Sequence, residues 1–214
     1  FVATYALAIT SIILLTGYSG QLSLGQSALM AVGAYAGALT SFNAGLHPVI
    51  GLFMAALVAR VFGLILGLIA ARLSGPYLAG TTLALAISLP TLANQFPILG
   101  AEEGIVFDVG LPPARFGEEF SQYKWFFWIS ALATLVMVWF IANLLSTKYG
   151  RTFRALRDNP IAAELSGINV GRLKVTAFAI SSGVAGLSGG LLVMLISGVS
   201  PSAFPLSLSF ALLG

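Results

Sequence analysis

The stretch that decides the fold reads YGRTFRALRDNPIAAELSGINVGRLK and covers Tyr149–Lys174. The chain on both sides of this stretch is mostly apolar, whereas the stretch itself is rich in charge. Its basic side chains are Arg151, Arg154, Arg157, Arg172 and Lys174, and its acidic ones are Asp158 and Glu164. A basic stretch between apolar segments is typical of a loop beside a membrane. The sequence therefore predicts membrane spans joined by a basic loop.

The first half of this loop has the spacing of a helix. Arg151, Arg154 and Arg157 recur every third residue, so a helix would put them on roughly one side. Asn159-Pro160 then interrupts the helix, because the residue before a proline is pushed out of the α region. Proline is well suited to the first turn of a new helix, so Asn159 is predicted to cap a second helix that begins at Pro160.

The second helix is short and amphipathic. We expect it to run for about two turns and to stop at Gly167 in the left-handed conformation. Ile161, Leu165 and, just past its end, Ile168 would then lie on one side. The loop would thus form two short helices joined at an angle on the membrane surface. Such an element can press into a groove on a soluble partner.

Composition supports the membrane assignment. Of the 214 residues, 58% are hydrophobic and 8% are charged, and the mean hydropathy is +0.98. Soluble domains carry about 25% charged residues. Cysteine is absent, so we expect no disulfide framework, no thiolate metal site and no cysteine nucleophile. No catalytic constellation, metal site or cofactor site is expected in this chain.

The expected fold is all-α, a polytopic helical transmembrane bundle in a single domain over residues 1–214. Stretches near the ~20 residues needed to cross a bilayer predict spans at about 1–16, 24–42, 49–71, 77–96, 125–146, 175–197 and, in part, 204–214. The first and last are read as truncated, because the chain begins at Phe1 and stops at Gly214 inside an apolar run.

Lysine and arginine predict the orientation. Loop 147–174 is rich in these residues, whereas loop 97–124 is mainly acidic. Positive loops face the cytoplasm, so we expect 147–174 inside and 97–124 outside. Segment 24–42 either spans the membrane or is re-entrant, and the second case would reverse everything before it.

Several blocks resemble a known family. IAAELSGI (161–168) is similar to the "EAA…G" loop of ABC importer permeases. RALRDNPIAAELSGINVGRLKVTAFAISSGVAGLSGGL (154–191) resembles the branched-chain amino acid permease family, in its LivM-like branch, as do Gly17–Leu39 and Ser200–Ser209. The general pattern places glutamate before the alanines. Here Glu164 follows them, so it is not given the general role.

The resemblance implies a permease subunit of an ATP-driven importer of branched-chain amino acids in a bacterial-type cell inner membrane. It implies three kinds of protein partner: ABC ATPase subunits, a second homologous permease subunit and an external solute-binding protein. The chain has no GxxxxGK[ST] phosphate loop, so ATP would be bound by the partners. The coupling residues would be Arg154, Arg157, Pro160, Ala162, Ala163, Glu164 and Gly167. The alternative is a basic loop that contacts anionic membrane lipid. Nucleic-acid binding is not expected.

Polar residues inside apolar segments are candidates for a translocation pathway. The candidates are Gln21, Ser23, Gln26, Ser27, Thr81 and Thr82. The first four sit at a glycine-broken start of an apolar segment, which is typical of a discontinuous helix that can receive a substrate carboxylate. The alternative is that these side chains only join helices by hydrogen bonds.

Other intramembrane residues have structural interpretations. Arg60 lies near the middle of an expected span and should face protein or water, either to bind a carboxylate or to pair with a carbonyl. Gly33/Gly37, Gly63/Gly67 and Gly186/Gly190 have GxxxG spacing, which allows close helix contact within this chain or with a partner.

Two further functions stay open. The same branch resembles permeases for urea or other small amides. The chain could also be a non-conducting structural membrane subunit, which a dry, fully packed interior around Gln21–Ser27 and Thr81 would support.

Overall fold

The computed structural model describes residues 1–43, 48–73, 75–100, 103–107, 109 and 121–213. Its helices are α1 (Val2–Ile12), the π-helical continuation η1 (Ile13–Tyr18), α2 (Gln26–Asn43), α3 (Pro48–Arg72), α4 (Pro76–Gln95), α5 (Gln122–Ser146), α6 (Lys148–Asp158), α7 (Pro160–Leu165), α8 (Val170–Ile196) and α9 (Leu206–Ala211). Short 3-10 turns are η2 (Pro97–Leu99) and η4 (Pro201–Ala203).

Within the described residues, α3, α4, α5 and α8 are long and apolar enough to cross a membrane, and Val2–Tyr18 is a shorter apolar helix. This confirms the all-α, polytopic fold that the sequence predicts. A two-residue ladder pairs β1 (Ile105–Val106) antiparallel with β2 (Gly198–Val199), with Ile105 opposite Val199. The ladder joins the loop after α4 to the end of α8.

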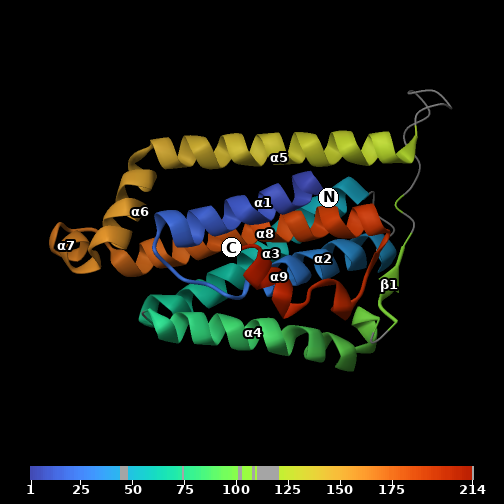
Figure 1. Cartoon of the computed structure of the whole chain (residues 1–214), viewed down its shortest axis with the longest axis horizontal. Coiled ribbons are helices and arrows are strands. Elements are labelled where there is room, and N and C mark those ends of the chain that lie inside the picture. Colours follow the sequence, from blue (N-terminus) through green and yellow to red (C-terminus); the bar gives the residue numbers. More distant parts are fainter. Residues whose placement is uncertain (44–47, 74, 101–102, 108, 110–120, 214) are drawn as a thin grey trace.

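Helix α8 is the centre of the bundle. It packs against α1, α2 and α3, while α4 and α5 lie at opposite outer sides (Figure 1). Almost every residue from Ala177 to Met194 is buried. Many of them are Gly, Ala or Ser, and small residues let helix backbones approach closely in a membrane.

The glycine pairs noted in the sequence lie at these contacts. A Cβ on Gly186 would come within 2.7 Å of the Ala55 carbonyl in α3, and one on Gly190 within 2.8 Å of the Ala55 side chain. A Cβ on Gly67 would approach the Val175 backbone of α8 to 2.9 Å. The GxxxG spacing therefore serves close packing inside this chain.

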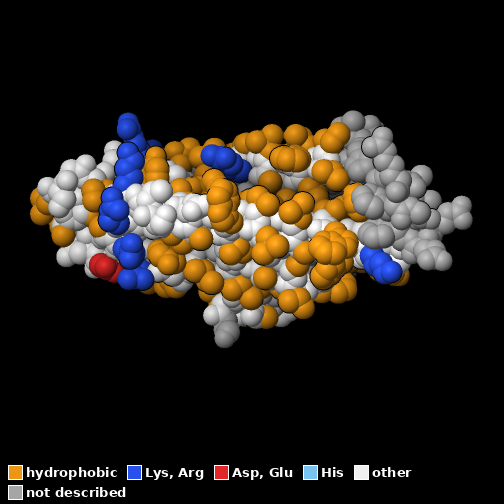
Figure 2. Space-filling view, turned by 90° about the horizontal axis from the view of Figure 1, so that it is seen from above, with side chains coloured by type: hydrophobic (Ala, Val, Ile, Leu, Met, Phe, Trp, Pro, Cys, Tyr) orange, Lys and Arg blue, Asp and Glu red, His pale blue; other side chains and the backbone are white. Residues whose placement is uncertain are grey.

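The outer helices expose apolar side chains. Phe127, Trp128, Leu135 and Trp139 of α5 are each more than half exposed. Figure 2 shows a broad apolar surface along the length of the molecule. In a bilayer such a surface faces lipid or another membrane subunit.

Basic side chains gather at one end of the molecule, the end that holds α6 and α7 (Figures 1 and 2). We call it the basic end, and it is the end that the sequence predicts to face the cytoplasm. Most of the charged residues of loop 97–124, namely Glu102, Asp108, Arg115, Glu118 and Glu119, lie outside the described residues.

The segment predicted as 24–42 has two parts. Residues 19–25 are non-helical, and α2 follows them. We call Ser19–Gly25 the broken segment. It begins against Arg157 at the basic end, whereas Gln26 just after it bonds to Ser181 within α8. The chain thus enters the bundle in a non-helical form and becomes helical from Gln26 onward. The stretch predicted as 204–214 begins instead with the short helix α9.

Replacing Gly189 by alanine tests the close packing of α2 on α8. The added methyl group would press on the backbone carbonyl of Met30 in α2, which moves only if the helices separate. Overpacking of this kind costs typically about 1–3 kcal/mol, so we expect Gly189→Ala to lower the free energy of unfolding by that amount. The measurement is reversible unfolding of the full-length protein in detergent.

Gly80→Ala in α4 is the matched control. A Cβ there meets nothing within 4 Å, and alanine is a better helix former than glycine. We expect this variant to be as stable as the parent or slightly more stable. Equal stability of the two variants would contradict the packing described.

Candidate functional site

Helix α6 is amphipathic in the way the sequence predicts. It begins after Thr147, whose Oγ1 accepts a hydrogen bond from the Tyr149 amide at 3.3 Å. Gly150, Phe153 and Leu156 form its buried side. Arg151, Arg154 and Arg157 are exposed. Helix α6 is therefore held on the bundle by its apolar side and presents positive charge outward.

The break between α6 and α7 confirms the prediction at Asn159-Pro160. Asn159 is extended, with φ −156° and ψ 97°, and its Oδ1 accepts the Ala162 amide at 3.0 Å. Helix α7 ends at Leu165, and Gly167, just past its C-cap Ser166, is left-handed with φ 82°. The Gly167 amide bonds to the Glu164 carbonyl at 2.9 Å and the Ile168 amide to the Ala163 carbonyl at 3.1 Å. These two bonds form a Schellman stop.

Helix α7 presents apolar side chains to the outside. Ile161 is 71% exposed and Leu165 is 85% exposed. Ala162 and Glu164 are also exposed, whereas Ala163 is buried. Helix α7 lies at the extreme basic end of the molecule (Figure 1). Large apolar side chains at such a tip are typical of a surface that binds a partner.

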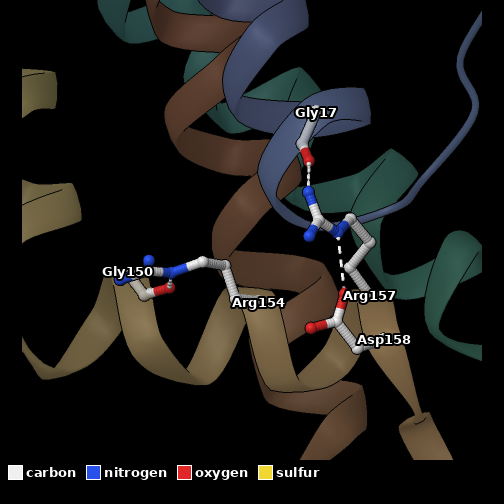
Figure 3. A network of polar contacts seen from close by, with 5 residues as sticks. All are labelled: Gly17, Gly150, Arg154, Arg157 and Asp158. Atoms are coloured by element: carbon white, nitrogen blue, oxygen red, sulfur yellow. Dashed lines mark hydrogen bonds and ion pairs between the residues drawn. The ribbon is translucent and has the colours of Figure 1, made fainter.

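The two predicted coupling arginines play different parts (Figure 3). Arg154 Nε donates to the Gly150 carbonyl of its own helix at 3.3 Å. Arg157 Nη1 instead donates to the Gly17 carbonyl of η1 at 2.8 Å, and its Nε pairs with Asp158 at 3.0 Å. Gly20, left-handed with φ 68°, also lies directly against Arg157. Arg157 therefore joins the basic loop to the start of the broken segment.

The broken segment is held by hydroxyl groups from distant elements. The Leu24 amide donates to Thr82 Oγ1 of α4 at 3.0 Å, and the Ser27 amide to Ser209 Oγ of α9 at 3.0 Å. Ser209 Oγ in turn donates to Ser27 Oγ at 2.7 Å. Unpaired amides at a buried helix start are costly. These contacts supply the partners that the start of α2 needs.

Gln26 lies at the centre of a second polar cluster. Its Nε2 bonds to Ser11 of α1 and to Ser181 of α8, the latter at 3.5 Å. Ser181 Oγ also donates to the Ser11 carbonyl at 2.9 Å. All three side chains are buried, and Gln26 Oε1 has no partner among the described residues. This cluster ties α1, α2 and α8 together at depth.

The predicted pathway residues therefore do not form one group. Gln21, Ser23, Gln26, Ser27 and Thr82 are buried along or beside the broken segment. Thr81 is exposed on the side of α4, where it lines a groove of about 300 Å³ shared with α3. Its Oγ1 donates only to the Leu78 carbonyl of its own helix, at 2.9 Å. Thr82 lines the same groove, but only Thr82 also bonds to the broken segment.

Sequence reasoning did not single out Ser11, Ser181 or Ser209. Each lies in a mostly apolar segment beside or near another hydroxyl residue, and its partner lies more than a hundred residues away or on another helix. The sequence around a serine in an apolar segment does not indicate such a partner. Only the packing of the helices reveals it.

Arg60 lies in the middle of α3 and is exposed. It lines a groove of about 290 Å³ between α3, α5 and α8, together with residues such as Phe53, Met137 and Gly183. No acidic side chain lines this groove among the described residues. Arg60 therefore faces away from the core. Across the described part of the chain, no group of three or more His, Cys, Asp or Glu residues could hold a metal ion.

Comparison with known proteins gives the family. Residues 1–214 match the family described as branched-chain amino acid transport system / permease component. The chain is 35% identical over 213 residues to the high-affinity branched-chain amino acid transport system permease protein LivM of Salmonella typhimurium and to that of Escherichia coli. Each match covers 88% of this chain and 49% of the relative.

The chain is also 29% identical over 213 residues to the ribose import permease protein RbsC of Haemophilus influenzae, with coverage of 94% of this chain and 60% of that protein. The chain spans about half the length of the LivM relatives it matches. No solved structure matches it.

Substitutions of two adjacent threonines test whether hydrogen bonding by Thr82 stabilises the broken segment. Thr82→Val removes the acceptor of the Leu24 amide and leaves a buried donor without a partner. Such a loss costs about 1–3 kcal/mol, so we expect the free energy of unfolding to fall by that amount. Thr81→Val is the control, because Thr81 bonds only within its own helix and is exposed. We expect its effect to stay within about 0.5 kcal/mol.

Detergent unfolding of both full-length variants would measure the difference. If Thr81→Val and Thr82→Val were equally stable, the hydroxyl of Thr82 would not be holding the broken segment.

Proposed function

This chain belongs to the permease component family of branched-chain amino acid transport systems, and from that premise we propose that it is a permease subunit of an ATP-driven importer of leucine, isoleucine and valine. The family and the apolar helices fit a multi-pass protein of the cell inner membrane. A permease is the membrane component of a transport system. The chemistry of ATP hydrolysis is proposed to reside in separate ATPase subunits, so this chain needs no cofactor of its own.

We propose three protein partners. The ATPase subunits would bind at the basic end, where α7 exposes Ile161 and Leu165. A second homologous permease subunit and membrane lipid would cover the apolar sides of α4 and α5. An external solute-binding protein would deliver the amino acid at the opposite end. Apolar side chains on α7 suit the groove of a soluble partner, and the arginines of α6 suit acidic groups around it.

One observation carries the proposal: Arg157 joins the loop that would contact the ATPase to the broken segment inside the bundle. A helix pushed at its tip would move Arg157, and with it the Gly17 carbonyl and Gly20. Motion would then pass through a direct contact to the broken segment, which is not helical. Coupling between two sites requires a physical connection of this kind.

We propose that the buried polar residues act through the broken segment that they contact. Gln21, Ser23, Gln26, Ser27 and Thr82 would act on the pathway by holding the broken segment in one arrangement and releasing it in another. Thr81 would line the pathway only if it runs along the α3/α4 groove. The packing around Gln26 also suits the structural alternative, in which these groups only join helices.

A reconstituted transporter tests the proposal. We expect the full-length protein, assembled with its partners in proteoliposomes, to take up leucine when ATP is supplied. Arg157→Ala breaks the contact with Gly17, and a charge-assisted hydrogen bond is worth about 1.5–3 kcal/mol. Uptake per ATP hydrolysed should therefore fall roughly tenfold or more. Arg154→Ala, which loses only a bond within α6, should leave this ratio close to that of the parent.

Substrate choice is read in the same assay. Ribose is the competing substrate because of the likeness to RbsC, and urea is the amide alternative. Uptake of ribose or urea in preference to leucine would contradict the amino acid assignment. An assembly that transports none of these compounds with a functional ATPase would favour the non-conducting subunit.

The exposed tip of α7 gives a separate prediction for the ATPase contact. Leu165→Glu would put a charge where an apolar contact is expected, and burying an unpaired charge is costly. We expect co-purification of the ATPase to fall at least about tenfold, the size of a typical hot-spot loss. Tyr149→Glu places the same charge on an exposed aromatic residue at the other end of the loop. It should retain the ATPase, and equal losses in both variants would count against α7 as the docking helix.

A further inference from the structure

A cavity of about 160 Å³ lies at the basic end, beside the junction of α6 and α7. Its wall combines the broken segment, the end of α3, the start of α4, the end of α6 and the start of α8. Leu22 and Pro160, which line it, are exposed, so the cavity opens to the surface. It is smaller than the ~300–1,000 Å³ of pockets for drug-sized ligands. Its size suits a small metabolite.

The charge of this cavity selects an anion. Arg157 and Lys174 line it, and no acidic side chain does so among the described residues. Lys174 Nζ uses one donor, on the Leu73 carbonyl at 3.1 Å. Arg157 uses Nε and Nη1, as described above. An ammonium has three donors and a guanidinium five, so both cations keep free donors. Asp158 offsets part of this charge, which leaves an excess of one positive group.

The rest of the wall suits the other groups of an amino acid. Gln21 lines the cavity, and its Oε1 has no hydrogen-bond partner among the described residues. This oxygen is itself buried. An amide oxygen is an acceptor, and an ammonium group would reach it after the Gln21 side chain turns toward the cavity. Leucine side chains form the apolar part of the wall: Leu22, Leu73, Leu78 and Leu156. Two cations, one free acceptor and an apolar surface match a zwitterion with a branched aliphatic side chain.

We infer that this cavity is a second amino acid site, in which a free amino acid with an apolar side chain places its carboxylate between Arg157 and Lys174 and its ammonium on Gln21. The inference rests on the proposed function, because imported leucine, isoleucine or valine would be the ligand on this side. The headgroup of phosphatidylglycerol offers the same negative charge. It carries no ammonium, so only a glycerol hydroxyl could donate to the Gln21 acceptor.

Occupation of this site would regulate transport. The ligand would contact the broken segment and the basic loop at once, through Gln21 and Arg157 respectively. It would stabilise the arrangement in which these parts are close, and any ligand that prefers one arrangement shifts the equilibrium toward it. Accumulated product would therefore slow further import from the cytoplasmic side.

Binding of radiolabelled L-leucine tests the site directly. The sample is the full-length permease with its membrane and ATPase partners in nanodiscs of phosphatidylcholine, without the solute-binding protein. Lys174→Gln keeps a donor for Leu73 but removes the charge, and loss of a charged hydrogen-bond partner should weaken leucine binding about tenfold. Lys174→Arg retains the charge and should bind as the parent does. Lys148→Gln removes a charge at the same end, outside the cavity, and should change nothing.

One analogue of leucine and one competing lipid identify which groups of the ligand the cavity recognises. Leucinamide lacks the carboxylate, so its weak binding should be the same in the parent and in Lys174→Gln. Phosphatidylglycerol in the nanodisc should leave leucine binding unchanged. If leucine binds Lys174→Gln as tightly as the parent, the site is refuted. If phosphatidylglycerol competes with leucine and abolishes its binding, the cavity holds a lipid headgroup and the amino acid assignment is wrong.

Transport separates this inference from the proposed function. Leucine preloaded on the cytoplasmic side should slow uptake severalfold in the parent and much less in Lys174→Gln. Normal uptake with no effect of preloading in either protein would overturn the second site while leaving the importer intact. Binding of leucine that depends on Lys174, in an assembly that transports no amino acid, would support the site and count against the proposed function.

Discussion

The structure depends on one constraint: inside a bilayer no water is present to satisfy backbone amides and carbonyls. Helices meet this constraint by themselves, but the broken segment Ser19–Gly25 does not. It is tolerable only because other elements bring polar groups to it. Thr82 of α4 and Ser209 of α9 accept amides around the start of α2, and Arg157 donates to a carbonyl just before the segment. The surrounding helices must therefore pack in register for the break to exist.

That packing comes from the small residues of α8. Glycines on α8 let α2 and α3 approach until backbone atoms touch, which fixes the depth at which Gln26, Ser11 and Ser181 meet. A larger residue on α8 would move the hydroxyl groups away from the amides they satisfy. The apolar packing and the polar cluster are consequently not independent contributions. Close contact of helices sets the geometry of the hydrogen bonds. These bonds offset the free-energy cost of the backbone groups that the broken segment leaves without helical partners.

Features with local causes could be predicted from the sequence. Asn159-Pro160 and Gly167 define α7 through the conformations that proline and glycine favour, and the GxxxG pairs mark helix contacts. Features with distant causes could not. The sequence spacing predicts the same role for Arg154 and Arg157, yet only Arg157 reaches Gly17. Thr81 and Thr82 are neighbours of the same type, and one helical step of about 100° separates an exposed side chain from one that holds the broken segment. The polar character of the site was predictable from the sequence. Which residues make up the site depends on how the helices pack.

The basic residues of the loop have a second role beyond orientation. Helices η1 and α3 both end at the basic end, and a helix C-terminus carries partial negative charge on its unpaired carbonyls. Arg157 donates to the Gly17 carbonyl of η1, and Lys174 donates to the Leu73 carbonyl just past α3. The same cations on which the predicted orientation rests thus satisfy the ends of two apolar helices. Any displacement of this loop would have to stretch or break its bonds to the last turns of those helices. The distribution of charge that predicts the orientation therefore also connects the surface of the protein to its interior.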